Sequence, residues 1–323
     1  MRSYRYVIEE KYQGMRVQDY LKQVHGYSRR NLIKLKQLPD GLVLNGKRIR
    51  TVDLLHTGDL LETAFPDDLR TPVAVPADPA IIRYEDDDVM VVDKPPFMPV
   101  HESKRHQEDT LANLFAGICE QRGQPLAFRP VNRLDRDTSG LVVAAKNSHY
   151  ASILWKSVKK EYLAVICGVP QQDFFRIEAP ISRKEDSLIE RCVREDGQYA
   201  LTDCQVLSKG EGYSLCRVRI ATGRTHQIRV HMAYLGYPLA GDTLYGMDQK
   251  WIDRHALHCF LARFPDLSRQ HVKEVFSPLP QDFLRLMERT GLTLPRPMPD
   301  FPSDAEQPSG KSGYGVPVNE QGK

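Results

Sequence analysis

Two aspartates lie close together between residues 131 and 147, in the stretch VNRLDRDTSGLVVAAKN. An ionised aspartate can act as a nucleophile or as a base. Asp137 precedes two hydroxyl residues and a glycine, an order typical of a turn, so we expect its carboxylate to cap that turn. Asp135 lies in an extended stretch with no turn to cap, which makes it the better catalytic candidate. Because Arg133 and Arg136 flank it, a surface ion pair is the alternative, and this stretch alone favours the ion pair.

Two enzyme classes that use aspartates in similar settings do not fit. The letters DTSG invite comparison with aspartic proteases, but that chemistry needs two carboxylates that share a proton, each from its own copy of the element. This chain has one copy, and charged residues precede it. A glycosidase needs two catalytic carboxylates facing one sugar, and we find no partner for Asp135 beyond Asp137.

The segment that carries these aspartates alternates short strands with a few helices. Strands are predicted at 80–84, 89–95, 141–146, 161–168 and 213–221, and helices at 110–121, 148–158, 226–236 and 280–291. Many strands are only four to seven residues from the next turn signal. This rhythm favours an antiparallel α+β sheet over a doubly wound parallel sheet. We therefore predict one α+β domain over residues 80–292.

The first 66 residues predict a separate small domain. Its expected elements are a helix at 15–26, a helix at 29–38 capped by Ser28, a hairpin around Asn45-Gly46 and a strand at 60–65. This order, over residues 13 to 65, resembles the S-four fold, a small RNA-binding α/β module first seen in a ribosomal small-subunit protein. It departs from the usual pattern by an inserted Leu-Pro-Asp before Gly41.

Basic residues are concentrated in this small domain. Between residues 22 and 50 there are eight Lys and Arg against a single acid, Asp40. Such clustering is expected of a nucleic-acid binder, although a solvated helix face would have the same composition. The charge count alone does not separate the two. With the resemblance, we expect Arg29, Arg30 and Lys34 to contact RNA.

The rest of the sequence indicates where the domains end and argues against membrane, secreted, zinc-binding and disulfide-bonded proteins. Residues 67–79 predict a linker rich in Pro and Asp, and residues 293–323 predict a disordered tail. No apolar run approaches the ~18 residues of a membrane span, and no secretory signal is visible, so we expect no membrane partner and a cytoplasmic protein. The six cysteines have no CxxC pair and no Cys/His cluster, which argues against zinc and disulfides and predicts buried reduced thiols.

Four motifs in order give the sequence its family resemblance. RLDRDTSGLVVAAKN closely resembles the central motif of the RluA-type RNA pseudouridine synthases, and VVDKPPFMPVH, KKEYLAVICG and TGRTHQIRVHMAYLGYPLAGDTLYG resemble three further motifs of that family. ALHCFLARF is similar to its leucine-bearing strand. One departure is Asn132, at a position that is usually His. An amide can form hydrogen bonds but does not titrate near neutrality, so we interpret it as a structural replacement.

The resemblance implies a pseudouridine synthase fold and a role for each matching residue. Asp135 would be the nucleophilic aspartate, and Arg229 would pair with it, because a planar guanidinium can hold a carboxylate through two hydrogen bonds. Arg229 would lie on a flank of the helix 226–236, which Thr225 is expected to cap. Tyr162 would stack on the flipped base. The remaining implied contacts to base or RNA are Leu257, Arg224, His226, Lys94 and Arg133.

The implied reaction isomerises a uridine of a structured RNA, ribosomal or transfer RNA, to pseudouridine. The N1 to C1' bond breaks, the uracil turns and C5 joins the same carbon, so no cofactor and no metal are needed. The nucleotide must be extruded from its stack before the carboxylate can reach it. We expect a monomer. The alternative is an RNA-binding factor that retains the fold without catalysis.

Overall fold

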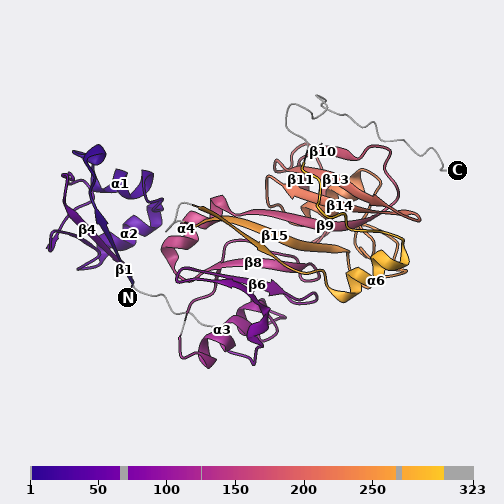
Figure 1. Ribbon diagram of the computed structural model, residues 1–323, viewed down its shortest axis with the longest axis horizontal. Helices are drawn as coiled ribbons and strands as arrows, with labels where there is room; N and C mark the ends of the chain where they lie inside the picture. The colour runs from indigo at the N-terminus through magenta and orange to yellow at the C-terminus, as the bar shows by residue number, and fades with distance from the viewer. Residues whose placement is uncertain (1, 66–71, 125, 267–270, 302–323) are drawn as a thin grey trace.

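The computed structural model describes residues 2–65, 72–124, 126–266 and 271–301, and Figure 1 shows a small N-terminal module beside a long, curved sheet. The module contains β1 (Arg2–Val7), α1 (Val17–Gln23), α2 (Arg29–Gln37), β2 (Leu42–Leu44), β3 (Lys47–Arg48) and β4 (Leu60–Phe65). Its strands form an antiparallel sheet in the order β1-β4-β2-β3. A separate core of the module packs beneath the two helices.

The local signals read from this part of the sequence are confirmed. The Ser28 hydroxyl accepts the backbone N–H of Asn31 at 3.1 Å and so caps α2. Asn45 and Gly46 both have positive φ, which is the conformation of a two-residue hairpin turn. The strand β1 was not predicted, and it completes the sheet by pairing with β4 along its whole length.

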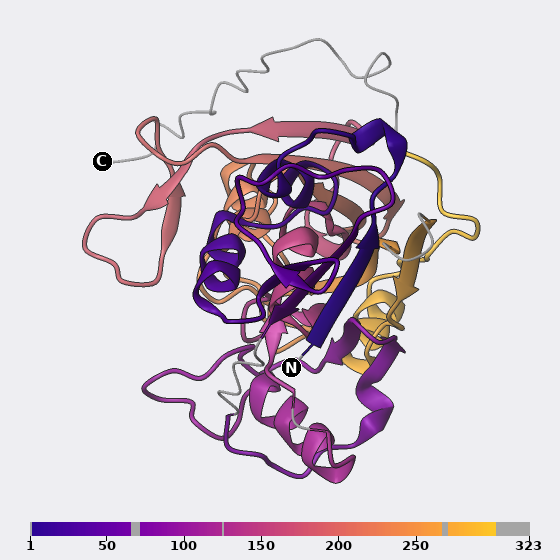
Figure 2. The same ribbon diagram turned by 90° about the vertical axis from the view of Figure 1, so that its left-hand side faces the viewer.

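The module contacts the rest of the protein through α4 (Ser148–Ser157). The Asn31 side chain donates to the Ser152 hydroxyl at 3.2 Å, and the ring of His149 lies 3.9 Å from the ring of Tyr27 and 4.9 Å from that of Tyr4. Figures 1 and 2 together place the module at one end of the large sheet. An aromatic contact therefore joins the two parts of the chain.

The larger part is built on a ten-stranded sheet. Eight strands run in the order β10-β13-β14-β9-β15-β8-β6-β5, with β16 beside β15 and β7 beside β8. Every pairing is antiparallel except that of β8 with β15, so the predicted α+β class with a mainly antiparallel sheet is confirmed. The strands are β5 (Ile82–Glu85), β6 (Val89–Lys94), β7 (Arg129–Pro130), β8 (Ser139–Ala145), β9 (Lys159–Cys167), β10 (Phe174–Glu178), β13 (Leu201–Lys209), β14 (Tyr213–Ile220), β15 (Leu257–Asp266) and β16 (His271–Phe276).

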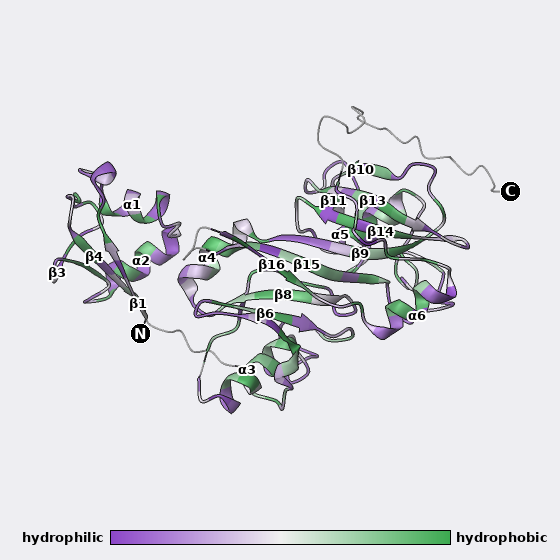
Figure 3. Ribbon diagram, in the orientation of Figure 1, coloured by the Kyte–Doolittle hydropathy of each residue, from purple (hydrophilic) through white to green (hydrophobic). Residues whose placement is uncertain are grey.

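Helices and one hairpin flank this sheet. The four helices that the sequence predicts are present as α3 (Leu111–Gln121), α4, α5 (Gln227–Tyr234) and α6 (Gln281–Arg289). A separate hairpin of β11 (Ile181–Arg183) and β12 (Arg191–Val193) was not predicted. The main core lies around β6, β8 and β9, and every residue of β8 is buried. Figure 3 shows β8 in the hydrophobic colour along most of its length, as expected of a central strand covered on both faces.

The predicted linker and tail are only partly described. Residues 67–71 of the linker lie outside the described residues, whereas Val73 and Val75 form hydrogen bonds with Asn113 of α3. Residues 302–323 of the predicted disordered tail also lie outside. Residues 293–301, which we expected to be disordered, instead pack on the sheet, where Phe301 lies 3.8 Å from the Arg219 guanidinium. The few large apolar side chains of this segment are enough to hold it.

The cysteines and the hydropathy of the helices add two findings. All six cysteines are free, four of them buried and two, Cys167 and Cys192, half-buried. Among the described residues, none of the helices is both long enough and apolar enough to span a bilayer.

Candidate functional site

The candidate site is built on the loop 131–138, which connects β7 to β8 and carries Asp135. Asn132 fixes the start of this loop against β8: its amide donates to the Leu141 carbonyl at 3.1 Å and accepts the Val143 N–H at 2.8 Å. Both partners are backbone groups of one strand. The amide at this position therefore has a positioning function, and it uses donor and acceptor at once.

Lys94 fixes the middle of the same loop from β6. Its ammonium group is fully buried and donates to the carbonyls of Pro95, Met98 and Arg136 at 2.8 to 2.9 Å. Burial lowers the pKa of Lys94 to about 7, although the charge of Asp137 acts in the opposite direction. We expected Lys94 to contact the RNA backbone. The structure contradicts this, because all three N–H groups of the buried side chain point at carbonyls.

The end of the loop is held by β15 and its preceding segment. The Thr138 hydroxyl and His255 Nε2 share a hydrogen bond of 2.7 Å, and the buried Arg254 donates to the Asp137 carbonyl at 3.1 Å. Gly140 allows the chain to pass close to β15: its φ is +108°, and a Cβ there would lie 2.2 Å from the Cys259 carbonyl oxygen. The loop is thus held at both ends and in the middle.

Asp137 does not have the expected local role. The turn is closed by the backbone, with the Thr138 N–H donating to the Asp135 carbonyl at 3.1 Å. The Asp137 carboxylate instead pairs with its exposed neighbour Arg136, whose Nε lies 2.7 Å from Oδ1. The surface ion pair considered for this stretch therefore belongs to Asp137, and Asp135 is left for other contacts.

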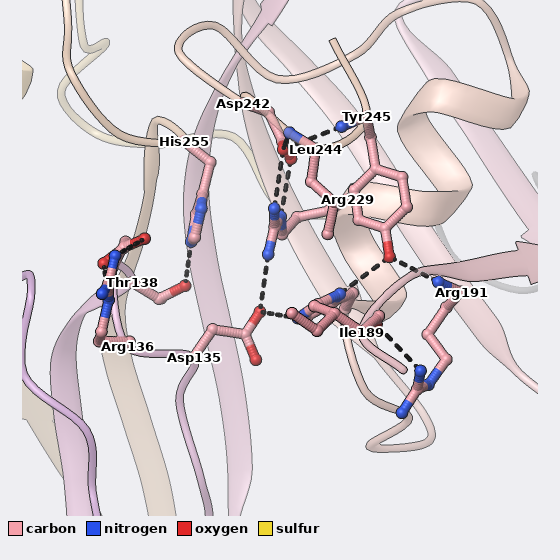
Figure 4. Close-up of polar contacts among 12 residues, drawn as sticks. Asp135, Arg136, Thr138, Ile189, Arg191, Arg229, Asp242, Leu244, Tyr245 and His255 are labelled. Carbon is pink, nitrogen blue, oxygen red and sulfur yellow. Dashed lines mark hydrogen bonds and ion pairs between the residues drawn. The ribbon is translucent and has the colours of Figure 1, made fainter. Parts of the chain in front are cut away.

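Arg229 lies in α5 between two carboxylates, as Figure 4 shows. Its Nε and Nη2 each donate to Asp242 at 2.7 Å, whereas Nη1 lies 3.6 Å from Asp135 Oδ2. The expectation that Arg229 holds Asp135 through two hydrogen bonds is wrong, because both of those bonds go to Asp242. Arg229 does lie beside Asp135, but its orientation is set by the other carboxylate.

The two carboxylates differ in exposure. The Asp242 side chain is completely buried, while that of Asp135 is 20% exposed. Burial acts to raise the pKa of Asp242, but the hydrogen bonds and charge of Arg229 outweigh it and hold that pKa below the usual range. Asp242 also accepts the backbone N–H groups of Leu244 and Tyr245. Asp242 thus fixes the cation, and Asp135 remains accessible beside it.

His226 forms the other neighbour of Asp135. We expected Thr225 to cap α5, but the N-cap is His226, whose φ of 56° lies in the left-handed region and whose side chain makes no cap bond. Its Nε2 lies 3.8 Å from Asp135 Oδ2, and its Nδ1 shares a hydrogen bond of 2.8 Å with the Tyr245 hydroxyl. Burial lowers the pKa of His226 below its usual value, although Asp135 acts to raise it, and the lowered pKa favours the neutral ring.

Tyr245 extends these contacts to the β11–β12 hairpin. Its hydroxyl accepts the backbone N–H of Arg191 at 2.8 Å, so its own hydrogen is available to His226 Nδ1. This arrangement favours the histidine tautomer that presents Nε2–H to Asp135. The Tyr245 ring also lies 5.0 Å from the Arg229 guanidinium. One tyrosine therefore contacts both groups that flank Asp135.

Tyr162 and Leu257 lie on neighbouring strands, next to this group. Burial raises the pKa of Tyr162 well above its usual range, and Cys259 and the negative charge of Asp135 act in the same direction, which places the phenol within electrostatic reach of Asp135. Tyr162 is only 4% exposed and belongs to the main core, so little of its ring is accessible for the stacking that we expected. Leu257 is buried in the same core.

The other expected RNA contacts are scattered. Arg133 is exposed on the loop 131–138. Arg224 is half-buried, and its Nε donates a hydrogen bond to the Tyr199 carbonyl. Arg29 and Arg30 are exposed and Lys34 half-buried in α2, which lies against α4. The helix α4 follows the far end of β8, a strand of seven residues or roughly 20 Å. The structure therefore does not bring these three residues to Asp135.

Sequence reasoning missed the residues that position the site. Asp242 and Tyr245 lie in the motif that also contains Arg229, and Gly241-Asp242 was a visible turn signal without an assigned role. Arg254 and His255 precede the leucine-bearing strand and carried no signal.

Within the described ranges no group of three His, Cys, Asp or Glu side chains could hold a metal ion. What the geometry offers is one accessible carboxylate beside a fixed guanidinium and a neutral imidazole, which suits nucleophilic or base catalysis.

Comparisons with known proteins identify the family of the chain. Residues 88–234 match the family model described as RNA pseudouridylate synthase. The chain is 38% identical to the uncharacterized RNA pseudouridine synthase YjbO of Bacillus subtilis, covering 85% of this chain and 99% of that protein. It is 34% identical to ribosomal large subunit pseudouridine synthase D of Pseudomonas aeruginosa, covering 77% of this chain and 84% of that protein.

Solved structures give the same fold. The human protein RNA Pseudouridylate Synthase Domain Containing 4 superposes with a TM-score of 0.55 at 22% identity, covering 66% of this chain and 94% of that one. RNA Pseudouridylate Synthase Domain Containing 1, also human, superposes with a TM-score of 0.51 at 26% identity, covering 73% and 100%. From the matched motifs, the relatives and the fold, this chain belongs to the RNA pseudouridine synthase family.

Proposed function

We propose that this enzyme converts a uridine of ribosomal RNA to pseudouridine, with Asp135 as the group that starts the reaction. The observation that carries the proposal is the pairing of the accessible Asp135 carboxylate with Arg229, whose Nη1 lies 3.6 Å away. The name of the Pseudomonas relative supports ribosomal RNA as the substrate. The enzyme acts as a monomer in the cytoplasm, without metal or cofactor.

In this mechanism Asp135 acts either as a nucleophile on the ribose or base, or as a base that removes a sugar proton. Both routes require an ionised carboxylate. Arg229 places a cation beside it, and Asp242 prevents the guanidinium from closing on Asp135 in a two-bond pair that would occupy the carboxylate oxygens. His226 Nε2 lies 3.8 Å from the same Asp135 oxygen, so its N–H adds a favourable electrostatic contact without a direct hydrogen bond.

Two groups assist when the uracil has been released and turned. C5 must lose a proton after it has joined the sugar, and N1 must gain one, so that the product is an isomer of the substrate. Tyr162 has a raised pKa and stays protonated at neutral pH, so it acts as a hydrogen-bond donor to the extruded nucleotide. Leu257 forms part of the apolar wall behind the base.

The N-terminal module binds RNA at a distance from the residues that react with the uridine. Arg29, Arg30 and Lys34 bind phosphates of a structured region, and Arg133 and Arg224 bind phosphates near the extruded nucleotide. Because the module lies at the far end of β8, roughly 20 Å from Asp135, the two contacts fall on separate parts of one RNA. The family resemblance of the module, as well as its charge, supports this assignment.

The test is release of tritium to water from transcribed large-subunit ribosomal RNA that carries the label at uridine C5. We expect Asp135→Asn to abolish release while RNA binding and folding are unchanged. Asp137→Asn is the matched control, since within the described residues its carboxylate forms an ion pair with the exposed Arg136 alone. Equal loss of release in the two variants, both folded, would contradict the role of Asp135. Absence of release by the wild-type enzyme would refute the choice of substrate.

A further inference from the structure

Phe97 has an unusual backbone conformation and lies beside the loop 131–138, which carries Asp135. Its φ is +63°, in the left-handed region. Three other non-glycine residues share a positive φ among those described, namely Asn45, Asp186 and His226, and all three are of types that tolerate it. A phenylalanine is strained in this region, whereas a glycine would adopt it without cost. The protein therefore keeps a large side chain where the backbone prefers none.

The Phe97 side chain is also exposed. It is 54% exposed and belongs to none of the hydrophobic cores, so packing does not account for its presence. Single exposed apolar residues are common on protein surfaces. Phe97 differs from them because strain and exposure coincide, and strained residues persist at functional sites when the surroundings hold them in place.

The surroundings do hold this residue firmly. On both sides of Phe97, Lys94 binds the carbonyls of Pro95 and Met98, and the same ammonium group binds the carbonyl of Arg136. The Met98 N–H also donates to the Arg136 carbonyl at 3.0 Å. The low pKa of the buried Lys94 shows that this arrangement has an electrostatic cost. Phe97 is thus rigidly attached to the residue that follows Asp135.

The groups around Phe97 suit single-stranded RNA. Arg133 is exposed, and the side chain of Arg136 is 54% exposed, one on each side of Asp135 in the sequence. Phe97 and Asp135 directly precede the two residues that the Met98–Arg136 hydrogen bond joins, so from the chain spacing they lie within roughly 12 Å of each other. Aromatic faces interleaved with cations are the usual means of holding unstacked bases. Tyr162, in contrast, is only 4% exposed.

We propose that Phe97 stacks on a nucleobase next to the target uridine and so compensates for the stacking that extrusion removes. This inference rests on the proposed function, because it needs an RNA whose uridine enters the site. It assigns a nucleobase subsite beside the loop 131–138, outside the residues that act on the reacting nucleotide. The ring faces solvent before the RNA arrives and covers a base afterwards.

Three substitutions separate the ring from the backbone strain. Phe97→Gly removes both the ring and the strain, Phe97→Leu keeps the strain and removes the ring, and Phe97→Trp keeps both. Phe276→Ala is the matched control, because Phe276 is an equally exposed aromatic on β16, a strand that pairs with β15 and not with β6 or β8. Each variant is assayed for KM and kcat by tritium release from the labelled ribosomal RNA transcript, for equilibrium binding of the same transcript, and for thermal unfolding.

We expect Phe97→Gly to raise the melting temperature and to raise both KM and the dissociation constant roughly tenfold, which is the size of one lost base stack. We expect kcat to be unchanged at saturation. Phe97→Leu should bind as weakly as Phe97→Gly, and Phe97→Trp should resemble the wild type. The inference is refuted if Phe97→Gly or Phe97→Leu has wild-type KM and binding while the wild type turns over. If the wild type binds the transcript without turnover, the proposed function fails and the binding constants still test Phe97.

Discussion

Replacement of Asp242 by asparagine would test whether the orientation of Arg229 controls the reaction. Asp242→Asn keeps Oδ1, which accepts the N–H groups of Leu244 and Tyr245, and removes the negative charge and the acceptor for Arg229 Nε. The Asp242 and Arg229 side chains are both buried, so solvent does not screen the pair. Removing one partner of a buried ion pair costs about 3–5 kcal/mol, and the retained bonds place this variant near the lower value.

We expect the loss of the Asp242 carboxylate to lower the rate of catalysis as well as the stability of the fold. Without Asp242 the guanidinium is free to rotate toward Asp135, where two hydrogen bonds would occupy the oxygens that must react. A shift of about 1 Å at a reacting group lowers the rate on the order of 100-fold. We therefore expect kcat, from tritium release at saturating RNA, to fall by about that factor, and the free energy of unfolding, from urea titration, to fall by about 3 kcal/mol.

A second Arg–Asp pair provides the control. Arg176 Nε and Nη2 bind Asp203 at 2.6 and 3.1 Å, in the same two-bond geometry, on β10 and β13 away from the site. Asp203→Asn should leave kcat unchanged and cost about 0–1 kcal/mol, because the Arg176 side chain is partly exposed. If Asp242→Asn retains kcat within about twofold of the wild type while it loses stability, Asp242 holds the fold only, and the reasoning fails.

Two further predictions concern hydrogen bonds and pH. Tyr245→Phe removes the hydroxyl that binds His226 and should lower kcat severalfold with unchanged KM and an altered pH profile, whereas Tyr84→Phe, which loses a hydroxyl on the edge strand β5, should not. A wild-type pH profile in Tyr245→Phe would contradict a role for His226. Burial lowers the pKa of His149 to about 3 from 6.5, so its contribution to stability is complete above pH 6.5 and is lost as the pH falls. In His149→Phe, which keeps a ring against Tyr27, the loss of unfolding free energy between pH 7.5 and 5 should be about 2 kcal/mol smaller than in the wild type, and an equal loss would refute this.

The elements that carry strong local signals were predictable, and β1 shows where the signal was hidden. Periodicity identified the helices, and Ser28 and Asn45-Gly46 marked a cap and a turn. In β1 the inward residues Tyr4 and Tyr6 alternate with outward residues such as Arg5, but the charges and the short length masked the period. The pairing of β1 with β4 joins residues almost sixty positions apart, and no local rule predicts such a partner.

The sequence predicted which residues form the site, but not which side chains form hydrogen bonds with one another. The motifs identified Asp135 and Arg229, and the structure places them side by side. A motif does not specify which of several carboxylates takes the two hydrogen bonds of a guanidinium, since that depends on the geometry of the loop that carries Asp242. The burial of two side chains was also not predictable. Lys94 and Tyr162 have polar groups that are expected to face solvent or a ligand, whereas the packed sheet covers both.

The amide of Asn132 has a consequence for acid tolerance. An imidazole at this position, which is usual in the family, would lose its only acceptor on protonation and release the Val143 N–H that ties the loop to its neighbouring strand. A carboxamide keeps donor and acceptor over the whole range in which proteins stay folded. In this enzyme the anchorage of the loop 131–138 through Asn132 is therefore independent of proton concentration, and any acid limb in its activity must arise from other groups.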